Sequence, residues 1–436
     1  MSKSLTRRNP PTVAAVAATA LLAAACGGTS TTASTAAPTF GAPAKGEQIT
    51  VVLPSYAKIP ADMLTQFEQQ SGVKVTLSLD SWDNIRTRIV TANAAGQAIG
   101  DVTEFDWSWT GQFGSPALYT PLDNAISPAI TADLQNTKTF SRGGHMMAVC
   151  YSNDVRIGMY NKTKFAAAGI TAPPATFDEL TADLAKLKVS GASVNPLTLT
   201  ASATEGATTE WFLLSMMMGG NLFDAALRPQ FSDPASAGYK ALAFEVDAMR
   251  KGWASPAATT DKDQEADALF LGGKSAVQLV GNPGESQTAN DPTQSKVVGQ
   301  TAYFLEPGTA GPGKTFGLPE GLGIPARSTH KAAAAAFIRW ILQPEVQAEL
   351  LSKVSLLPCR ASAVHALVAG GKIVGGPVIE QQLTHLTPLF LNGAPTWYAK
   401  FSTDASALIN SAAKGEMTVA QAIAKMSDRA RQLGNG

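Results

Sequence analysis

The order of short β-branched runs and amphipathic helices constrains the fold of this chain most. A β-branched run at 49–53 is followed by helical spacing over 60–71 and by alternating apolar and polar residues at 73–77. Gly72, between the last two, is typical of the left-handed residue that ends a helix. A second helix and a third short strand, at 101–103, repeat the order. Strands that alternate with helices are typical of a parallel sheet covered by helices, so we expect an α/β fold.

Helix-start signals recur through the rest of the chain. Thr176 and Glu179 have the spacing of a capping box, and so do Thr418 and Gln421. Asp233-Pro234 is typical of an N-cap followed by proline at the first helical position. The whole body of the chain is therefore predicted to be α/β.

The first 26 residues have the layout of an export signal. Basic residues precede an uncharged apolar stretch at 13–25, which is short for a membrane span of about 20 residues. Small residues before Cys26 resemble a bacterial lipobox, although Ala23 stands where leucine is common, and a plain signal peptide is the alternative. We expect a lipidated Cys26 after a 1–26 signal peptide, and a flexible tether over 27–46. The protein would then be exported and lipid-anchored at the outer face of the cytoplasmic membrane.

Composition limits the partners of the remaining chain. Residues 47–436 suffice for two domains of about 150 residues each. The chain has 34 basic and 34 acidic residues and no basic run, so a nucleic-acid partner is not expected. The four histidines are scattered, and neither a metal site nor a cofactor is expected. Cys150 and Cys359 are either a disulfide, which an oxidising compartment permits, or two buried thiols.

Six segments in order resemble the maltose-binding-protein-like family (family 1) of extracellular solute-binding proteins of ABC importers. The most specific begins at Met159-Tyr160-Asn161-Lys162 and ends at Thr176-Phe177-Asp178-Glu179-Leu180. The others are Phe67-Glu68 to Val75, Ala94-Ala95-Gly96 to Val102, Tyr119-Thr120-Pro121-Leu122-Asp123, Phe270 to Val277, and Pro395-Thr396-Trp397-Tyr398 to Ala422. Together they span nearly the whole folded chain.

This resemblance implies a two-lobed periplasmic-binding-protein fold, type II-like, with a ligand cleft between lobes that a multi-strand hinge joins. The first lobe would hold 47–152 and 304–342, and the second 153–303 and 343–436. Ligands of open α/β sheets bind at the carboxyl ends of strands. The implied partners are a mono- or oligosaccharide and the transmembrane subunits of an ABC permease. We expect a monomer.

A sugar site needs flat aromatic surfaces for C–H faces and polar groups for hydroxyls. Asp106, Trp107 and Trp109 follow the third strand, and Tyr56 follows the first, which places them at a carboxyl end. The resemblance adds Trp397, and with it Glu210, Trp211 and Asn282. Each tryptophan also has a reading as core, which we favour for three that lie at helical spacing: Trp82, Trp253 and Trp340.

Other functions are less well supported by the sequence. The same fold could bind an amino acid, an opine or a polyol, and a secreted glycoside hydrolase would also place aromatic residues near carboxylates. The stretch 308–315 matches the phosphate-binding P-loop pattern, but the glycines and prolines after it exclude the helix that such a site requires. Neither a nucleophile elbow nor a His-Glu-x-x-His motif is present. We therefore expect a binding protein and not an enzyme.

Overall fold

The computed structural model describes residues 38–390 and 393–434. The predicted signal peptide, the predicted lipidation site Cys26 and residues 27–37 of the predicted tether lie outside these ranges. Within the rest of that tether, Phe40 packs against the core and the Gly46 N–H donates to the Gly72 carbonyl at 2.8 Å. The segment from Phe40 to Gly46 thus lies against the folded body.

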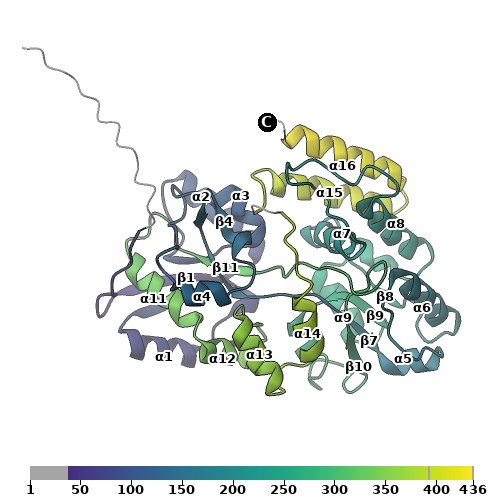
Figure 1. The fold of residues 1–436 in the computed structure, drawn as a ribbon, viewed down its shortest axis with the longest axis horizontal. Coiled ribbons are helices and arrows are strands. Elements are labelled where there is room, and N and C mark those ends of the chain that lie inside the picture. The colour runs from purple at the N-terminus through teal and green to yellow at the C-terminus, as the bar shows by residue number, and fades with distance from the viewer. Residues whose placement is uncertain (1–37, 391–392, 435–436) are drawn as a thin grey trace, which may run out of the picture. The chain divides into compact units, whose positions relative to one another are not determined.

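One sheet has the strand order β2-β1-β3-β11-β6. β1 is parallel to β2 and β3, whereas β11 runs antiparallel to both of its neighbours. Its strands are β1 (Gln48–Pro54), β2 (Lys74–Asp80), β3 (Val102–Glu104), β6 (Val149–Ser152) and β11 (Glu320–Gly323). The helices grouped around it in Figure 1 are α1 (Ala61–Ser71), α2 (Trp82–Ala94), α3 (Thr110–Phe113), α4 (Pro128–Asp133) and α11 (Lys331–Ile341). A two-stranded ribbon, β4 (Ser141–Arg142) and β5 (His145–Met146), precedes β6.

A second sheet has the order β10-β7-β9-β8. Its strands are β7 (Ile157–Asn161), β8 (Leu197–Thr198), β9 (Val277–Gly281) and β10 (Thr301–Phe304). The helices of this part are α5 (Lys162–Ala167), α6 (Phe177–Val189), α7 (Glu205–Met217), α8 (Ala237–Arg250), α9 (Asp263–Leu271), α10 (Pro283–Thr288), α15 (Tyr398–Ala413) and α16 (Val419–Gly434). They lie on the opposite side of Figure 1 from the first sheet and its helices. The expected two-lobed α/β architecture is therefore present.

The chain passes between the sheets at three places. It leaves β6 for β7 through 153–156 and returns from β10 to β11 through 305–319. It passes a third time ahead of α14 (Gly376–Leu383), which packs against β7 of the second sheet. These crossings form the multi-strand hinge that the resemblance implied.

The segment after α11 makes several contacts with the first lobe. Cys359, between α12 (Pro344–Val354) and α13 (Ala361–Ala369), is disulfide-bonded to Cys150 on β6, with the two Cα atoms 5.9 Å apart. Arg360 pairs with Asp133 at 2.7 Å. Figure 1 shows α12 beside α1 and α11. We therefore propose that the first lobe continues beyond residue 342 to about residue 362.

Helix ends test the local sequence signals directly. Gly72 is left-handed at the end of α1 with a φ of 73°, and the capping box of Thr176 and Glu179 opens α6 as predicted. The prediction for Asp233 is wrong, because α8 begins later, with Ser236 as its N-cap. The Asp233 carboxylate instead accepts the Ala235 N–H at 2.8 Å, which closes a turn around Pro234 before the helix.

Among residues 38–390 and 393–434, no helix combines the length and the apolar character that crossing a membrane requires.

Candidate functional site

Hydroxyl and carboxyl groups of four strands meet at one edge of the first sheet. Glu104 ends β3, Tyr151 lies near the end of β6, Tyr56 follows β1, and Glu320 begins the antiparallel β11. The Tyr56 hydroxyl donates to Glu320 Oε1 at 3.0 Å, and the Tyr151 hydroxyl donates to Glu104 Oε2 at 2.9 Å. The strand order therefore brings together residues that are far apart in the sequence.

Glu104 and Glu320 form a carboxyl pair at the centre of this edge. Glu104 is fully buried, and burial, followed by the charge of Glu320, raises its pKa well above the ordinary value. Burial and the charge of Asp106 raise the pKa of Glu320 to about 8. The buried atoms Glu104 Oε1 and Glu320 Oε2 receive no N–H or hydroxyl donor from the described part of the chain. We infer that the pair shares a proton near neutral pH, since two adjacent buried carboxylates repel each other.

Tyr56 has its hydroxyl enclosed and its ring near the surface. The residue is 46% exposed, yet burial and the charge of Glu320 raise the pKa of its hydroxyl. These observations agree if the hydroxyl, which bonds Glu320, is the enclosed end of the side chain. The ring then lies at the surface beside this edge of the sheet, and contact of Tyr56 with a ligand stays a prediction.

Asp106 caps the short turn that follows β3. Its Oδ1 accepts the Ser108 N–H at 2.7 Å and also the Ser108 hydroxyl, and Trp82 hydrogen-bonds the same carboxylate. Burial nevertheless raises its pKa to about 6. Trp109 is 1% exposed and packs on Trp82 with ring centroids 5.1 Å apart. Trp109 is thus part of the core, and Trp82, which we expected to be core, is half-buried and contacts Asp106.

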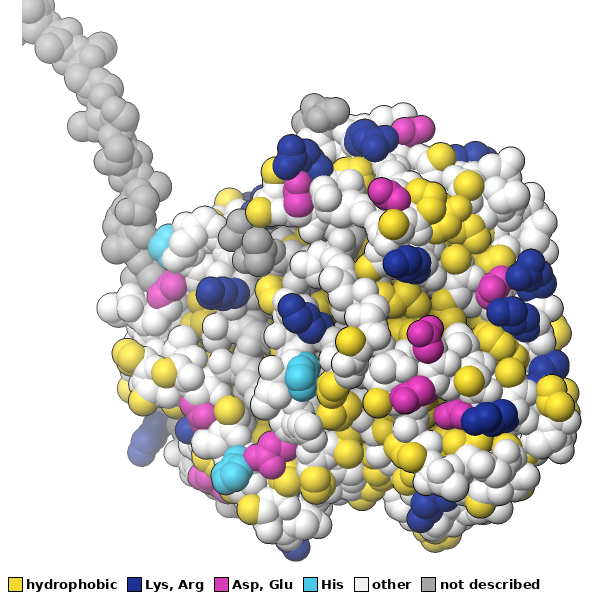
Figure 2. Space-filling model, turned by 45° about the vertical axis from the view of Figure 1, so that its right-hand side comes forward, with side chains coloured by type: hydrophobic (Ala, Val, Ile, Leu, Met, Phe, Trp, Pro, Cys, Tyr) yellow, Lys and Arg dark blue, Asp and Glu magenta, His cyan; other side chains and the backbone are white. Residues whose placement is uncertain are grey.

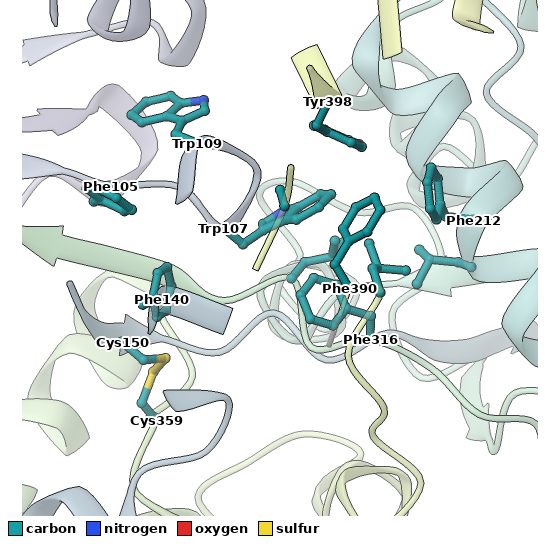
Figure 3. Packing of buried hydrophobic residues seen from close by; sticks show 14 of the residues in the cluster. Phe105, Trp107, Trp109, Phe140, Cys150, Phe212, Phe316, Cys359, Phe390 and Tyr398 are labelled. Carbon is teal, nitrogen blue, oxygen red and sulfur yellow. A yellow bond between two sulfur atoms is a disulfide. The ribbon is translucent and has the colours of Figure 1, made fainter. Parts of the chain in front are cut away.

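Trp107 is the centre of an aromatic cluster that spans both lobes. Its ring lies 5.2 Å from Phe316 in the 305–319 crossing and 5.2 Å from Tyr398 at the start of α15. Phe390, from the segment between α14 and α15, lies 5.6 Å from Tyr398, and Phe212 of α7 lies 6.1 Å from Tyr398. Figure 3 shows these five rings facing one another, with Trp109 apart from them. We call Trp107, Phe212, Phe316, Phe390 and Tyr398 the aromatic cluster.

Polar groups of the second lobe border the aromatic cluster. The Tyr398 and Ser402 hydroxyls both donate to Glu205, the first residue of α7. Burial, with smaller contributions from the charges of Asp106 and Asp263, raises the pKa of Glu205 to about 7 against the opposing effect of these two hydrogen bonds. An interaction of Glu205 with Asp106 means that the two lobes present carboxyl groups to the same region.

Arg156 is the cation of the first crossing, and its hydrogen bonds are made within the chain. It donates to Asp154 at 2.6 Å and to the Val280 carbonyl at 2.9 Å. Burial acts to lower the pKa of Arg156, but the opposing charges of Asp154, Asp267, Asp263 and Glu285 together outweigh burial and raise it. The guanidinium is thus held between carboxylates of the hinge and of the second lobe.

Four expected site residues have other roles. Trp211 is fully buried, donates its indole N–H to the Gly238 carbonyl at 2.7 Å, and belongs to the core of the second lobe. Glu210 is buried and accepts the Thr200 N–H at 2.8 Å. Asn282 caps α10 by accepting the Glu285 N–H at 2.8 Å.

Trp397 packs against Phe223 and Phe401, with centroids 5.4 and 5.9 Å away. The side chain that reaches Trp107 is that of the next residue, Tyr398. Successive side chains of a helix point about 100° apart around its axis. A prediction that is displaced by one residue therefore names a core residue in place of a site residue.

Sequence reasoning missed Glu104, Glu205, Tyr151, Glu320 and Tyr398. Glu104 had a usable signal, since it directly follows the predicted strand at 101–103 and ends the observed β3. Glu320 had none, because β11 enters the sheet antiparallel after a long crossing and presents its first residue, not its last. Groups of three or more residues able to hold a metal ion are absent from residues 38–390 and 393–434.

Two α/β lobes with polar groups at a facing sheet edge and an aromatic cluster between them define a two-lobed binding protein. The profile of the bacterial extracellular solute-binding protein family matches residues 51–348, and the chain belongs to this family. A binding protein of Brucella abortus (strain 2308) is 22% identical over 296 residues, which cover 67% of this chain and 70% of the relative.

Solved structures share the fold at low sequence identity. A solute-binding protein of an ABC transporter from Agrobacterium radiobacter K84, in complex with ribitol, is 18% identical with a TM-score of 0.79 and covers 90% of this chain and 100% of its own. A second, from Thermotoga lettingae TMO with α-D-tagatose, is 21% identical with a TM-score of 0.77 and covers 89% and 100%. A maltose-bound protein of T. maritima is 20% identical with a TM-score of 0.76 and covers 88% and 99%. The fold expected from the sequence is confirmed.

Proposed function

We propose that this protein captures a small carbohydrate or polyol between its lobes and delivers it to an ABC importer, without catalysis of its own. The observation that carries the proposal is that the polar edge of the first sheet and the aromatic cluster lie next to each other. Carboxyl and hydroxyl groups at the edge of the first sheet suit a ring of hydroxyls, and the aromatic cluster suits apolar C–H faces. The sugar and polyol ligands of the structural neighbours support this ligand class.

Both lobes supply the site, which suits a hinge mechanism. Trp107 comes from the first lobe and Tyr398 from the second, and their contact joins the lobes across the hinge crossings. A solute held between such groups would be bound best when the lobes are closed, and the permease would distinguish closed from open. The proposed partners are therefore the solute and the transmembrane subunits of the permease.

Export of the protein agrees with the family, which is extracellular. We further propose that the mature protein is anchored through lipidated Cys26 and acts as a monomer. The face in Figure 2 shows basic side chains interspersed with acidic ones, which fits a small solute better than a polyanion. Replacement of Cys26 by serine should move the protein from the membrane fraction to the medium, and retention in the membrane would contradict the anchor.

The ligand class can be tested by thermal shift followed by calorimetry. Monosaccharides, disaccharides, polyols and amino acids are added in turn, because a ligand that binds only the native state raises the melting temperature. Stabilisation by an amino acid alone would contradict the proposal. Turnover of an aryl glycoside would show that the protein is an enzyme.

The site itself can be tested at Trp107. Trp107→Ala removes the central ring of the aromatic cluster, and truncation of a buried aromatic anchor commonly costs more than about 2 kcal/mol of binding free energy. We expect the Kd of the stabilising sugar to rise by about a factor of thirty or more. Trp253→Ala is the matched control, because Trp253 is buried elsewhere in the second lobe and packs near Lys251. Equal effects of both changes would mean that loss of stability, and not loss of stacking, weakens binding.

A further inference from the structure

Val280 has a backbone conformation that valine rarely adopts. Its φ is 50°, in the left-handed region, where a β-branched residue is a genuine outlier. Ile157 faces Gly281 and Met159 faces Gln278, so β9 contains one residue more than β7 between these two pairs. The extra residue makes a β-bulge, and glycine is the usual residue where a bulge requires a left-handed backbone. Val280 therefore carries strain that glycine would avoid.

The second lobe fixes the N–H side of this residue. The Val280 N–H donates to Oε1 of Glu306, which is fully buried, at 2.9 Å. Glu306 follows β10 by two residues, and its own N–H donates to Gln382 Oε1 of α14 at 2.9 Å. Because α14 packs against β7 of the second sheet, the Glu306 carboxyl group keeps its place relative to β9.

Arg156 holds the carbonyl side of Val280 and belongs to a crossing. Its Nη1 donates to the Val280 carbonyl at 2.9 Å, and its Nη2 donates to Asp154 Oδ2 at 2.6 Å. The Asp154 N–H donates to the Gly317 carbonyl at 2.7 Å, so the 153–156 and 305–319 crossings are bonded to each other at this point. One rigid planar guanidinium thus joins the paired crossings to the bulge of the second lobe. A bend of the crossings relative to β9 would separate Asp154 from Val280 and break one of the two bonds.

We propose that Val280 is a strained latch of the hinge, held in its left-handed conformation while the lobes are closed and relaxed when they separate. The two lobes are in contact in this structure, since the rings of Trp107 and Tyr398 lie 5.2 Å apart. Strain that is held only in the closed form favours the open form and so weakens solute binding. Val280 and Arg156 would then set solute affinity without touching the solute. The proposal rests on the proposed function and adds a regulation of that same site.

The test measures the separation of the lobes with no solute added. Spin labels are placed on Gln70→Cys of α1 and Val189→Cys of α6, which are exposed positions on the two lobes, and the distance between them is read by pulsed electron paramagnetic resonance. Cys26→Ser removes the third cysteine, so the labels react with the two introduced thiols. Val280→Gly should shift the distribution toward the short distance and raise the ratio of closed to open protein by about fivefold or more. Arg156→Lys keeps the charge without the planar fork and should shift it toward the long distance.

Leu227→Gly is the matched control, because Leu227 also has a positive φ, of 60°, but lies in a turn between α7 and α8. It relieves the same kind of strain away from the crossings and should leave the distance distribution unchanged. A distribution in Val280→Gly that matches the wild type, or an equal shift in Leu227→Gly, would overturn the latch. If Arg156→Lys does not fold, the two glycine variants decide.

Affinity is then measured with ribitol, maltose and glucose as probes. For any probe that binds, the Kd should fall in Val280→Gly by a factor similar to the change in the ratio of closed to open protein. An unchanged Kd beside a shifted distance distribution would overturn the effect on affinity. Binding of no sugar or polyol would contradict the proposed function, whereas the latch would still be decided by the distances.

Discussion

Glu306 allows a quantitative test of how buried acids set the pH dependence of stability. It lies in the 305–319 crossing and is fully buried, with Oε1 accepting the Val280 N–H at 2.9 Å and Oε2 without a donor in the described chain. Burial raises its pKa from 4.5 to about 8, against the opposing effects of that hydrogen bond and of Arg156. In the unfolded chain the same carboxyl would titrate near its ordinary value.

The sign of the effect follows from proton binding. Between about pH 4.5 and pH 8 the folded protein keeps a proton on Glu306 that the unfolded chain has lost, so stability rises as pH falls. Each pH unit in this window changes the free energy of unfolding by about 1.4 kcal/mol. At pH 7 the Glu306 carboxyl therefore lowers the stability of the protein by about 3 kcal/mol relative to a side chain that cannot ionise. Glu306→Gln retains the acceptor for the Val280 N–H and cannot ionise. We therefore compare the free energy of unfolding of Glu306→Gln with that of the wild type at two pH values. Between pH 4.5 and pH 7 the difference should shift in favour of the variant by on the order of 3 kcal/mol.

The measurement is the free energy of unfolding in urea, or the melting temperature, from pH 4.5 to pH 8 for both proteins. The two profiles should converge at the acid end and separate toward neutral pH, by roughly 5 °C in melting temperature at pH 7. Glu416→Gln, at an exposed position, should follow the wild type throughout. Parallel profiles of wild type and Glu306→Gln would refute the reasoning, since they would mean that Glu306 titrates normally in the folded state.

Two further changes test contacts that the first lobe makes with later parts of the chain. Gly111→Ala would place a Cβ 2.2 Å from the Pro395 carbonyl carbon, so we expect α3 to separate from the segment around Pro395 and the sugar affinity to fall. Gly41→Ala is the control, because a Cβ at Gly41 meets no atom within contact distance. An unchanged affinity in Gly111→Ala would contradict the importance of the contact. Replacing Cys150 and Cys359 together by serine opens a crosslink that spans 209 residues, for which chain entropy alone predicts a loss of about 5 kcal/mol. The double variant should melt well below the wild type in non-reducing buffer, and a melting temperature that matches the wild type would refute a stabilising disulfide.

Local sequence signals predicted the elements well because the interactions that decide them are local. The Gly72 helix end and the Thr176 capping box involve residues within four positions of each other. The exception, Asp233, is also local: its side chain closes a turn two residues on, and sequence alone does not separate that turn from a helix N-cap. Such competition between turn and cap moves a boundary by a few residues without changing the fold.

The tryptophans show why the site was harder to predict. Trp107, Trp211 and Trp397 are all aromatic residues close to predicted cleft segments, yet of the three only Trp107 packs its ring against Phe316 and Tyr398. Trp211 lies inside α7, where the position around the helix axis determines the environment, and this position turns its indole toward Gly238. Trp397 precedes α15 by one residue, and the start of the helix decides that Tyr398 points to Trp107 instead. An uncertainty of one or two residues at a helix end is therefore enough to misassign a site residue.

The polar part of the site depends on strand order, which no local pattern encodes. Tyr56 and Glu320 are 264 positions apart, and Tyr151 and Glu104 are 47 apart. Glu320 reaches the edge where β1, β3 and β6 end only because β11 inserts antiparallel between β3 and β6 after the chain has built the second lobe. The same insertion ties the carboxyl pair to the 305–319 crossing, which also carries Phe316. Any hinge motion that shifts this crossing would therefore move Glu320 and a wall of the aromatic cluster together, and this physical link would couple solute binding to lobe closure.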